Sequence, residues 1–419
     1  MSNVLLKNAV MMDGSKNFDL YIENGRIIKK GHGLTDNAEK TLDLQGCLVI
    51  PGFVESHLHL DIALMNPWDR PGRPASFRSP VELNEALEER RKHFTREDIE
   101  QRAGLGIEMA SRHGVTAIRA QCHVDREVGL KHVEALLNVR EKYRDRVTLQ
   151  IVTFPQQGLL NQPEMEKMLR EAFKMGVDVM GSASNLDPYV STPADANKYN
   201  DAAYEIAMDA GVDLDVHADL GIPKHVDFED LEVVHVARRA IEYGYQGRVT
   251  AGHVCALDSA EPDVAKRAID LISKAGVSVV SQPDMYRLGR EDQRSVRRGL
   301  TRVKQLLEAG VNVTFASNNI RDALRPMGNF DLLEEGLVLA YGAHMDSVAE
   351  LETLMRMCTE NAAKALRLEE YGLDVGDQAD LVVLDAVSPS AALVGQVEKL
   401  YVFKHGKLVA ANWRKSEIY

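Results

Sequence analysis

The chain alternates between short apolar runs and longer stretches in which apolar residues recur with helical spacing. The runs are rich in β-branched residues, which is typical of strands buried on both faces of a parallel sheet. Eight strands alternating with helices predict an α/β fold of the TIM type, a (β/α)8 barrel. An open doubly wound sheet is the alternative, but no glycine-rich fingerprint follows the first run. The eight runs span residues 47–53, 115–121, 147–154, 177–181, 212–219, 248–254, 277–282 and 311–318.

The segments between these runs show the spacing and the stop signals of amphipathic helices. Residues 162–175 place apolar side chains at i, i+3, i+4 and i+7, which predicts one such helix. Glycine ends several of these segments just before the next apolar run, as it commonly does at helix C-termini. The glycines concerned are Gly176, Gly211, Gly276 and Gly310.

Both ends of the chain have a different pattern, with short strands separated by tight turns. Strands are predicted at 4–8, 19–22, 26–29 and 41–44, and again at 380–384 and 401–409. We expect the two ends to form one small β-domain from residues 1–52 and 373–419, with the barrel at 53–372. Two separate flaps are the alternative.

Composition excludes some classes of function. The net charge is −13 and no basic run occurs, which argues against a nucleic-acid-binding protein. No apolar run reaches the ~20 residues of a membrane span, and the first residues lack the apolar core of a signal peptide. The cysteines lack CxxC spacing, which indicates reduced thiols and predicts a cytoplasmic protein. They are Cys47, Cys122, Cys255 and Cys358.

Two histidines stand where the first apolar run ends, in the sequence His57-Leu58-His59. Residues i and i+2 of a strand share a face, so both imidazoles project the same way and suit a single metal ion. Neutral imidazole is a common ligand for zinc and similar divalent ions. The alternative for this tripeptide alone is two ordinary strand histidines.

More histidines follow at other predicted strand ends. Active sites of (β/α)8 barrels are built at the C-terminal ends of the strands, so side chains there should converge. His217 follows the fifth strand and His253 the sixth. Such convergence is hard to explain by packing. His57, His59 and His217 are therefore candidate metal ligands, and His253 could hold the water that the metal binds.

Several segments resemble the amidohydrolase superfamily and, within it, the cytosine deaminase subgroup. The resemblance covers nearly the whole chain and is carried by residues 51–61, 149–158, 215–219, 248–253, 298–304 and 376–381. It implies a distorted (β/α)8 barrel with a small β-sandwich, and hydrolysis at a ring carbon that bears an amino or similar leaving group. It also implies one divalent metal, zinc or iron, with manganese also possible.

The same resemblance implies roles for individual residues. His57, His59 and His217 would be metal ligands, His253 would orient the attacking water, and Gln156 would hydrogen-bond a small heterocyclic substrate. We also expect a homo-oligomer.

Two departures from the subgroup concern proton transfer. The family's strand-eight aspartate, both metal ligand and base, is replaced by Asn318, whose amide can offer an oxygen to a metal but cannot accept a proton. The glutamate three residues after the strand-five histidine is replaced by Leu220. Asp219 could substitute only if the strand continues regularly, so that it shares the face of His217. Other candidate bases are Asp125, Asp284 and Asp322.

Three hypotheses follow. The first is a metal-dependent hydrolase of a heterocycle or cyclic amide with rewired proton transfer, for which a halide or thiolate leaving group would also suit. The second is a relative that binds its ligand without turnover. The third is an otherwise ordinary enzyme in which Asn318 is an introduced or local change. The loop at 65–74 is expected to cover the barrel mouth, and Arg287, Arg290 and Arg321 suggest an anionic or carbonyl-rich ligand.

Overall fold

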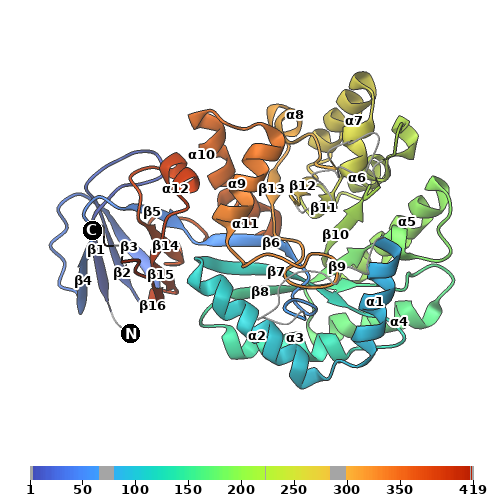
Figure 1. The fold of residues 1–419 in the computed structure, drawn as a ribbon, viewed down its shortest axis with the longest axis horizontal. Helices are drawn as coiled ribbons and strands as arrows, with labels where there is room; N and C mark the ends of the chain where they lie inside the picture. Colours follow the sequence, from blue (N-terminus) through green and yellow to red (C-terminus); the bar gives the residue numbers. More distant parts are fainter. Residues whose placement is uncertain (1–2, 66–79, 222, 284–298, 416, 418–419) are drawn as a thin grey trace.

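The computed structural model describes residues 3–65, 80–221, 223–283, 299–415 and 417, with only the backbone given at 80–84 and 86. Figure 1 shows a large α/β body and a smaller β-rich body beside it, which contains the first strands and the last strands of the chain. None of the described helices combines the length and the apolar character needed to cross a bilayer.

The large body contains one sheet of eight parallel strands whose spatial order follows the sequence from β6 to β13. This arrangement confirms the predicted TIM-type barrel. The strands are β6 (Phe53–Leu58), β7 (Val115–His123), β8 (Thr148–Phe154), β9 (Val179–Ser182), β10 (Asp213–Ala218), β11 (Val249–His253), β12 (Ser278–Ser281) and β13 (Val313–Phe315).

The first predicted strand, 47–53, is wrong as a barrel strand. Its residues Leu48–Pro51 form β5, which pairs antiparallel with β14 (Leu381–Leu384) in the small body. The barrel begins one residue after Gly52, with β6. A Cβ atom on Gly52 would lie 2.2 Å from the side chain of Thr116, so only glycine fits where the chain passes between the sheets. His57 therefore lies within the barrel strand.

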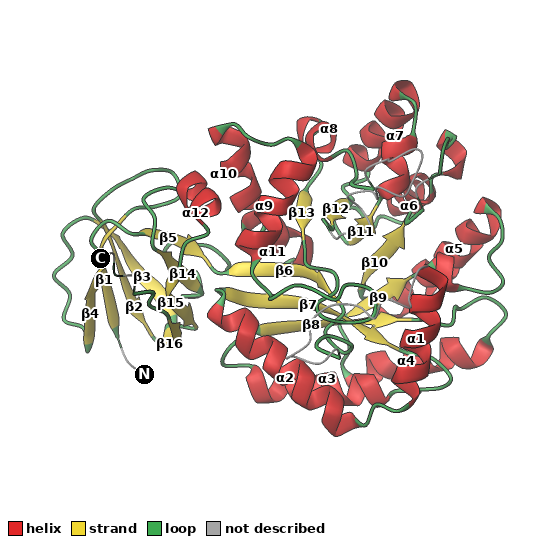
Figure 2. Cartoon of the chain, in the orientation of Figure 1, coloured by secondary structure: helices red, strands yellow, loops and turns green. Residues whose placement is uncertain are grey.

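Helices surround the barrel on the outside, as Figure 2 shows. Gly176 and Gly211 end α4 and α5 in the left-handed conformation, as predicted. The helices are α1 (Pro80–Lys92), α2 (Arg96–Arg112), α3 (Lys131–Tyr143), α4 (Pro163–Met175), α5 (Pro193–Ala210), α6 (Glu232–Glu242), α7 (Pro262–Lys274), α8 (Val303–Glu308), α9 (Leu332–Ala343), α10 (Val348–Met357), α11 (Glu360–Leu366) and α12 (Pro389–Gly395).

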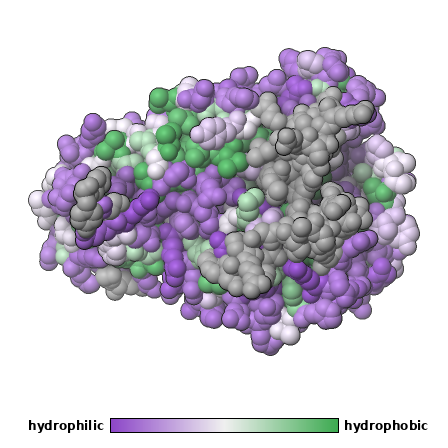
Figure 3. Space-filling model, in the orientation of Figure 1, coloured by the Kyte–Doolittle hydropathy of each residue, from purple (hydrophilic) through white to green (hydrophobic). Residues whose placement is uncertain are grey.

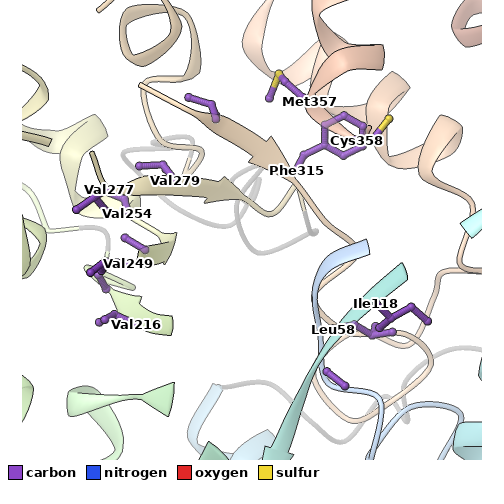
Figure 4. Packing of buried hydrophobic residues seen from close by; sticks show 14 of the residues in the cluster. Leu58, Ile118, Val216, Val249, Val254, Val277, Val279, Phe315, Met357 and Cys358 are labelled. Carbon is purple, nitrogen blue, oxygen red and sulfur yellow. The ribbon is translucent and has the colours of Figure 1, made fainter. Parts of the chain in front are cut away.

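Buried apolar side chains join the barrel strands to these helices. Figure 4 shows Phe315 of β13 facing Met357 and Cys358 at the end of α10, and Val216 of β10 beside Val249 of β11. All five side chains are fully buried or nearly so. This continuous core holds in place the strand ends that carry the polar side chains of the barrel.

The small body consists of two four-stranded sheets. One has the order β3-β2-β1-β4 and the other β16-β15-β14-β5. A single apolar cluster contains residues of both, among them Ile22 of β2 and Phe403 of β15. We propose that these sheets form the one small domain expected from residues 1–52 and 373–419. The new strands are β1 (Val4–Ala9), β2 (Phe18–Glu23), β3 (Arg26–Gly31), β4 (Lys40–Asp43), β15 (Lys399–Lys404) and β16 (Lys407–Ala411).

The face of the molecule seen in Figure 3 is mostly hydrophilic, with apolar side chains gathered over α9, α10 and α12. Tyr341, Val348 and Val394 are exposed on these helices. The homo-oligomer stays a prediction. Substitution of these exposed apolar residues is a first way to test it.

Candidate metal centre and active site

Three imidazoles meet inside the barrel at the C-terminal ends of two strands. The Nε2 atoms of His57 and His217 lie 3.1 Å apart, and those of His217 and His59 lie 3.3 Å apart. His57 belongs to β6, His59 follows it directly, and His217 belongs to β10. All three side chains are buried. The structure thus brings together the three histidines that the sequence suggested as metal ligands.

Their geometry and protonation fit a divalent metal ion. Two nitrogens bound to one zinc ion at about 2.1 Å in tetrahedral geometry lie about 3.4 Å apart, close to the separations seen here. Burial, together with neighbouring imidazoles, lowers the pKa of His59 and of His217 well below the usual range for histidine. Both rings are therefore neutral at pH 7 and have a lone pair to offer.

His253 stands beside this group at the end of β11. Its ring centroid lies 5.7 Å from that of His57 and 5.2 Å from that of His217. The backbone turns sharply here, because His253 and the buried Val254 both have positive φ, +73° and +50°. A β-branched residue rarely adopts that conformation, and such strain clusters at functional sites. The placement agrees with a site residue, and its role remains a prediction.

The backbone of Asn318 is hydrogen-bonded to the backbones of both His57 and His59. Its N–H donates to the His57 carbonyl at 3.0 Å, and its carbonyl accepts from the His59 N–H at 2.8 Å. Its φ of +61° is one that asparagine tolerates better than most residues. Asn318, which the resemblance places at the family's aspartate position, is therefore bonded through its backbone to two of the clustered histidines.

The neighbouring turn is held by a buried carboxylate. Glu55 accepts hydrogen bonds from the N–H of Ser317 at 3.0 Å and from its hydroxyl at 2.6 Å, while Arg325 donates to the Ser317 carbonyl. Burial raises the pKa of Glu55 to about 7, although these bonds oppose the shift. The contacts fix the backbone immediately before Asn318.

Gln156 follows β8 and lines a cleft of about 660 Å³. Its side chain is 9% exposed and makes no hydrogen bond with the residues that the structure describes. An amide that faces a cleft and has no protein partner can pair with a ligand, although none of the clustered histidines lines this cleft. The other residues lining this cleft include Glu88, Glu89, Arg126, Gln157 and Leu186.

The carboxylate of Asp219 is engaged in local structure. Strand β10 ends at Ala218, and Asp219 turns with a φ of +53°. Its carboxylate accepts from the backbone N–H groups of Glu232 at 2.8 Å and Val233 at 3.0 Å, at the start of α6. Burial and the nearby Glu232 charge raise the pKa of Asp219 to about 7. The regular strand that would have aligned Asp219 with His217 is absent, so this carboxylate caps a helix instead.

Two other candidate bases are occupied in local structure. Asp125 accepts from Arg91 at 2.6 Å and from two backbone N–H groups. Asp322 accepts from Asn319 at 2.6 Å and from two N–H groups of its own loop. Arg321 donates to the Gly328 carbonyl. Asp284, Arg287, Arg290 and positions 66–74 of the expected covering loop lie outside the described residues.

A second polar cluster was not predicted. Asp61 Oδ2 lies 2.8 Å from His123 Nδ1, 2.7 Å from His132 Nδ1 and 2.8 Å from the His123 N–H. These separations are those of hydrogen bonds and are shorter than two ligands of one metal ion would show. Burial opposes the ionised Asp61, but the imidazoles lower its pKa well below the usual range. His132 lies on α3, so strand ends alone could not reveal it.

Comparison with known proteins agrees with this geometry. The chain is 30% identical over 420 residues to N-isopropylammelide isopropyl amidohydrolase of Pseudomonas sp. (strain ADP), covering 98% of each chain. It is 30% identical over 378 residues to a pterin deaminase of Rhizobium rhizogenes, covering 88% of this chain and 82% of the relative. The structure of 5-methylcytosine deaminase from Klebsiella pneumoniae liganded with 5-fluorocytosine matches with a TM-score of 0.89 at 30% identity, over 99% of each chain.

The family model described as the amidohydrolase family matches residues 79–410, most of the barrel and the final strands. Its relatives hydrolyse or deaminate small heterocycles. The histidine cluster lies at the strand ends where such barrels carry their chemistry. The chain belongs to the amidohydrolase family.

Proposed function

We propose that this enzyme hydrolyses the bond between a ring carbon of a small nitrogen heterocycle, or cyclic amide, and its leaving group. The close approach of His217 Nε2 to the Nε2 atoms of both His57 and His59 carries this proposal. The substrates named for the relatives, an ammelide, a pterin and 5-methylcytosine, are all nitrogen heterocycles. They support the substrate class without selecting one compound.

The proposed site has one divalent metal, with zinc or iron favoured and manganese the third choice. His57, His59 and His217 would hold the ion, with the amide oxygen of Asn318 as a further ligand. Such an ion supplies Lewis-acid polarisation and makes water nucleophilic near neutral pH. His253 would orient the attacking water by a hydrogen bond, and the unpartnered amide of Gln156 would bind the heterocycle.

The kind of leaving group that this site can release depends on whether a nearby residue can donate a proton to it. Neither Asn318 nor Leu220 can move one, and Asp219 caps α6. General acid–base assistance is typically worth about 10²–10⁴-fold, so its loss slows release of a basic amine most. Halide and thiolate leave without protonation. Dehalogenation or desulfuration of a ring is therefore the form of this reaction that suits the side chains, alongside deamination.

The lack of a proton-transferring side chain at Asn318 and Leu220 also favours a second candidate function, ligand binding without turnover. A site that keeps its histidines and Gln156 but lacks the strand-eight carboxylate could bind a heterocycle and leave it intact. Only the hydrolase would convert the heterocycle to product, so measuring product formation distinguishes the two candidate functions.

The first experiment is elemental analysis of the purified protein, with His57→Asn as the site variant and His93→Asn as its control. His93 is a surface histidine with an exposed side chain. We expect about one equivalent of zinc, iron or manganese in the wild type and the control, and loss of it in His57→Asn. Equal metal content in all three proteins would overturn the metal site.

The second experiment measures turnover by the metal-reconstituted protein on matched ring compounds. Pyrimidines, triazines, pterins and hydantoins with amino, chloro or thio substituents would be tested for release of ammonia, chloride or thiol. Faster release of chloride or thiol than of ammonia is expected. Saturable binding of a heterocycle, with no product from any compound, would establish the silent relative instead.

A further inference from the structure

Gln282 is a buried amide that points into the barrel. It follows β12 directly, and alternation along that strand puts it on the face opposite Val279. Val279 lies in the apolar core between the strands and the helices, as Figure 4 shows, so Gln282 belongs to the inner face. It is 2% exposed. The barrel thus encloses a polar group at the C-terminal end of its seventh strand, where such barrels carry their chemistry.

This amide lies next to the histidine cluster. A Cβ atom on Gly252 of β11 would lie 3.2 Å from Gln282 Nε2 and 3.3 Å from His57 Cε1. Gln282 and His57 therefore both border the position that a side chain on residue 252 would fill. The amide is thus close enough to contact a small ring bound at these histidines.

Both polar atoms of the Gln282 side chain lack a hydrogen-bond partner within the part of the chain that the structure describes. Gln150 on β8 shows the usual arrangement, because its Oε1 accepts from Arg119 and its Nε2 donates to the Leu366 carbonyl. Most buried polar side chains have such partners. An amide with both atoms open is costly to bury, and it is arranged for a partner that the chain itself does not supply.

The chemistry of the amide selects that partner. A primary amide offers a carbonyl acceptor and an N–H donor side by side, so it pairs best with a ring edge that has a donor and an acceptor on adjacent atoms. Two kinds of edge fit: a ring N–H beside a C=O, as in a lactam, and an amino group beside an unprotonated ring nitrogen. A site built to pair with such an edge rejects analogues that lack the hydrogen.

We propose that Gln282 is a specificity-determining residue that binds such a donor–acceptor edge of the heterocycle. The inference rests on the proposed function and names the ring edge that the substrate needs. Gln156 follows β8, which lies four strands from β12 in the sheet, so the two amides stand on opposite walls of the barrel. Gln156 and Gln282 would therefore hold different edges of one ring.

The test is the dissociation constant of paired ring compounds from the metal-reconstituted full chain, measured by isothermal titration calorimetry. One pair is pyrimidin-2-one and 2-methoxypyrimidine, the other is 2-aminopyrimidine and 2-(dimethylamino)pyrimidine, and the corresponding triazines extend both. In each pair only the first compound has the N–H. The wild type should bind that compound about tenfold to a hundredfold tighter, because methylation leaves the Gln282 oxygen unpaired. The pair with the larger preference identifies the kind of edge.

Variants assign this preference to one residue. Gln282→Met removes both amide atoms at similar volume and should reduce the preference about tenfold, and Gln282→Leu is the second variant. Gln162→Met is the matched control, because Gln162 is also a buried glutamine but precedes α4, outside the barrel, and it should keep the preference of the wild type.

An unchanged preference in both Gln282 variants would overturn the inference, since the amide would then hold only water. Equal loss of affinity for both members of a pair would also overturn it, because a general distortion of the site acts on both compounds alike. In either case the proposed function would stand. A wild type that binds neither member of any pair would instead overturn the proposed substrate class, and the inference with it.

Discussion

The backbone N–H of His59 donates to the carbonyl of Asn318 at 2.8 Å. With the bond from the Asn318 N–H to His57, it pairs Leu58 with Asn318 as a parallel bridge between the first strand of the barrel and the turn after the last. The barrel is thus joined at Asn318, beside the histidine cluster. A side-chain change here alters the chemistry at the histidine cluster while the backbone contacts keep the geometry.

Asn318→Asp should therefore strengthen the site without disturbing the fold. Aspartate tolerates the same backbone conformation as asparagine, and it adds a charge and a proton acceptor. We expect tighter zinc binding and, on a heterocycle that the wild type binds, hydrolysis faster by about 10²–10⁴-fold. Metal affinity and turnover would both be measured, with Asn37→Asp at an exposed position as the charge control. Tighter binding with no gain in turnover would mean that the lost aspartate is not what limits catalysis.

Much of the fold could be predicted from the sequence because strand and helix periods are local properties. The split of the apolar stretch around Gly52 could not, since a continuous run does not show that the chain changes sheets. Strand alternation placed His57 and His59 together, and the convergence of strand ends added His217. The condition set for Asp219, a strand that continues regularly, is not met, because Asp219 is left-handed and β10 ends before it. The pairing of Asp61 with His132 emerges only from the folded structure, because His132 lies on the helix α3.

Gly252→Ala should weaken metal binding by displacing His57. A Cβ atom at this position would lie 3.2 Å from Gln282 Nε2 and 3.3 Å from His57 Cε1, so both side chains would have to shift by a few tenths of an ångström. We expect the zinc dissociation constant to rise about tenfold, which is typical when the residues that orient a metal ligand are changed. Gly31→Ala on β3, where a Cβ atom has open space, is the control. Equal affinities of the two variants would show that His57 has room to adjust.

Gln282→Met should stabilise the protein. Gln282 follows β12 and is 2% exposed, and neither amide atom has a hydrogen-bond partner among the described residues. Removing a buried group of this kind relieves its desolvation cost, and we expect the free energy of unfolding to rise by about 1 kcal/mol. Gln162→Met also removes an unpartnered buried oxygen but loses the bond from Nε2 to the Gln157 carbonyl, so it should stabilise the protein less than Gln282→Met does. Thermal unfolding of both variants checks this, and a less stable Gln282→Met would reveal a partner for the amide.

Asp331 should link stability to pH at the junction between the barrel and the small body. It caps α9 and accepts from His113 Nδ1 at 3.2 Å and from Lys399 of β15. Burial raises the pKa of its carboxyl, but the bond from His113 and the charge of Lys399 outweigh this and lower the pKa to about 2.

Because the folded pKa lies below the unfolded value of about 3.9, the stabilisation is present above pH 4 and is lost as pH falls towards 2. Asp331→Asn should therefore lower the free energy of unfolding by about 2 kcal/mol at pH 7. The difference from wild type should shrink between pH 4 and 2. The exposed Asp263 on α7 offers the control Asp263→Asn, which should match wild type throughout. A deficit in Asp331→Asn that stays constant down to pH 2 would show that helix capping, and not the ionised carboxylate, is what Asp331 contributes.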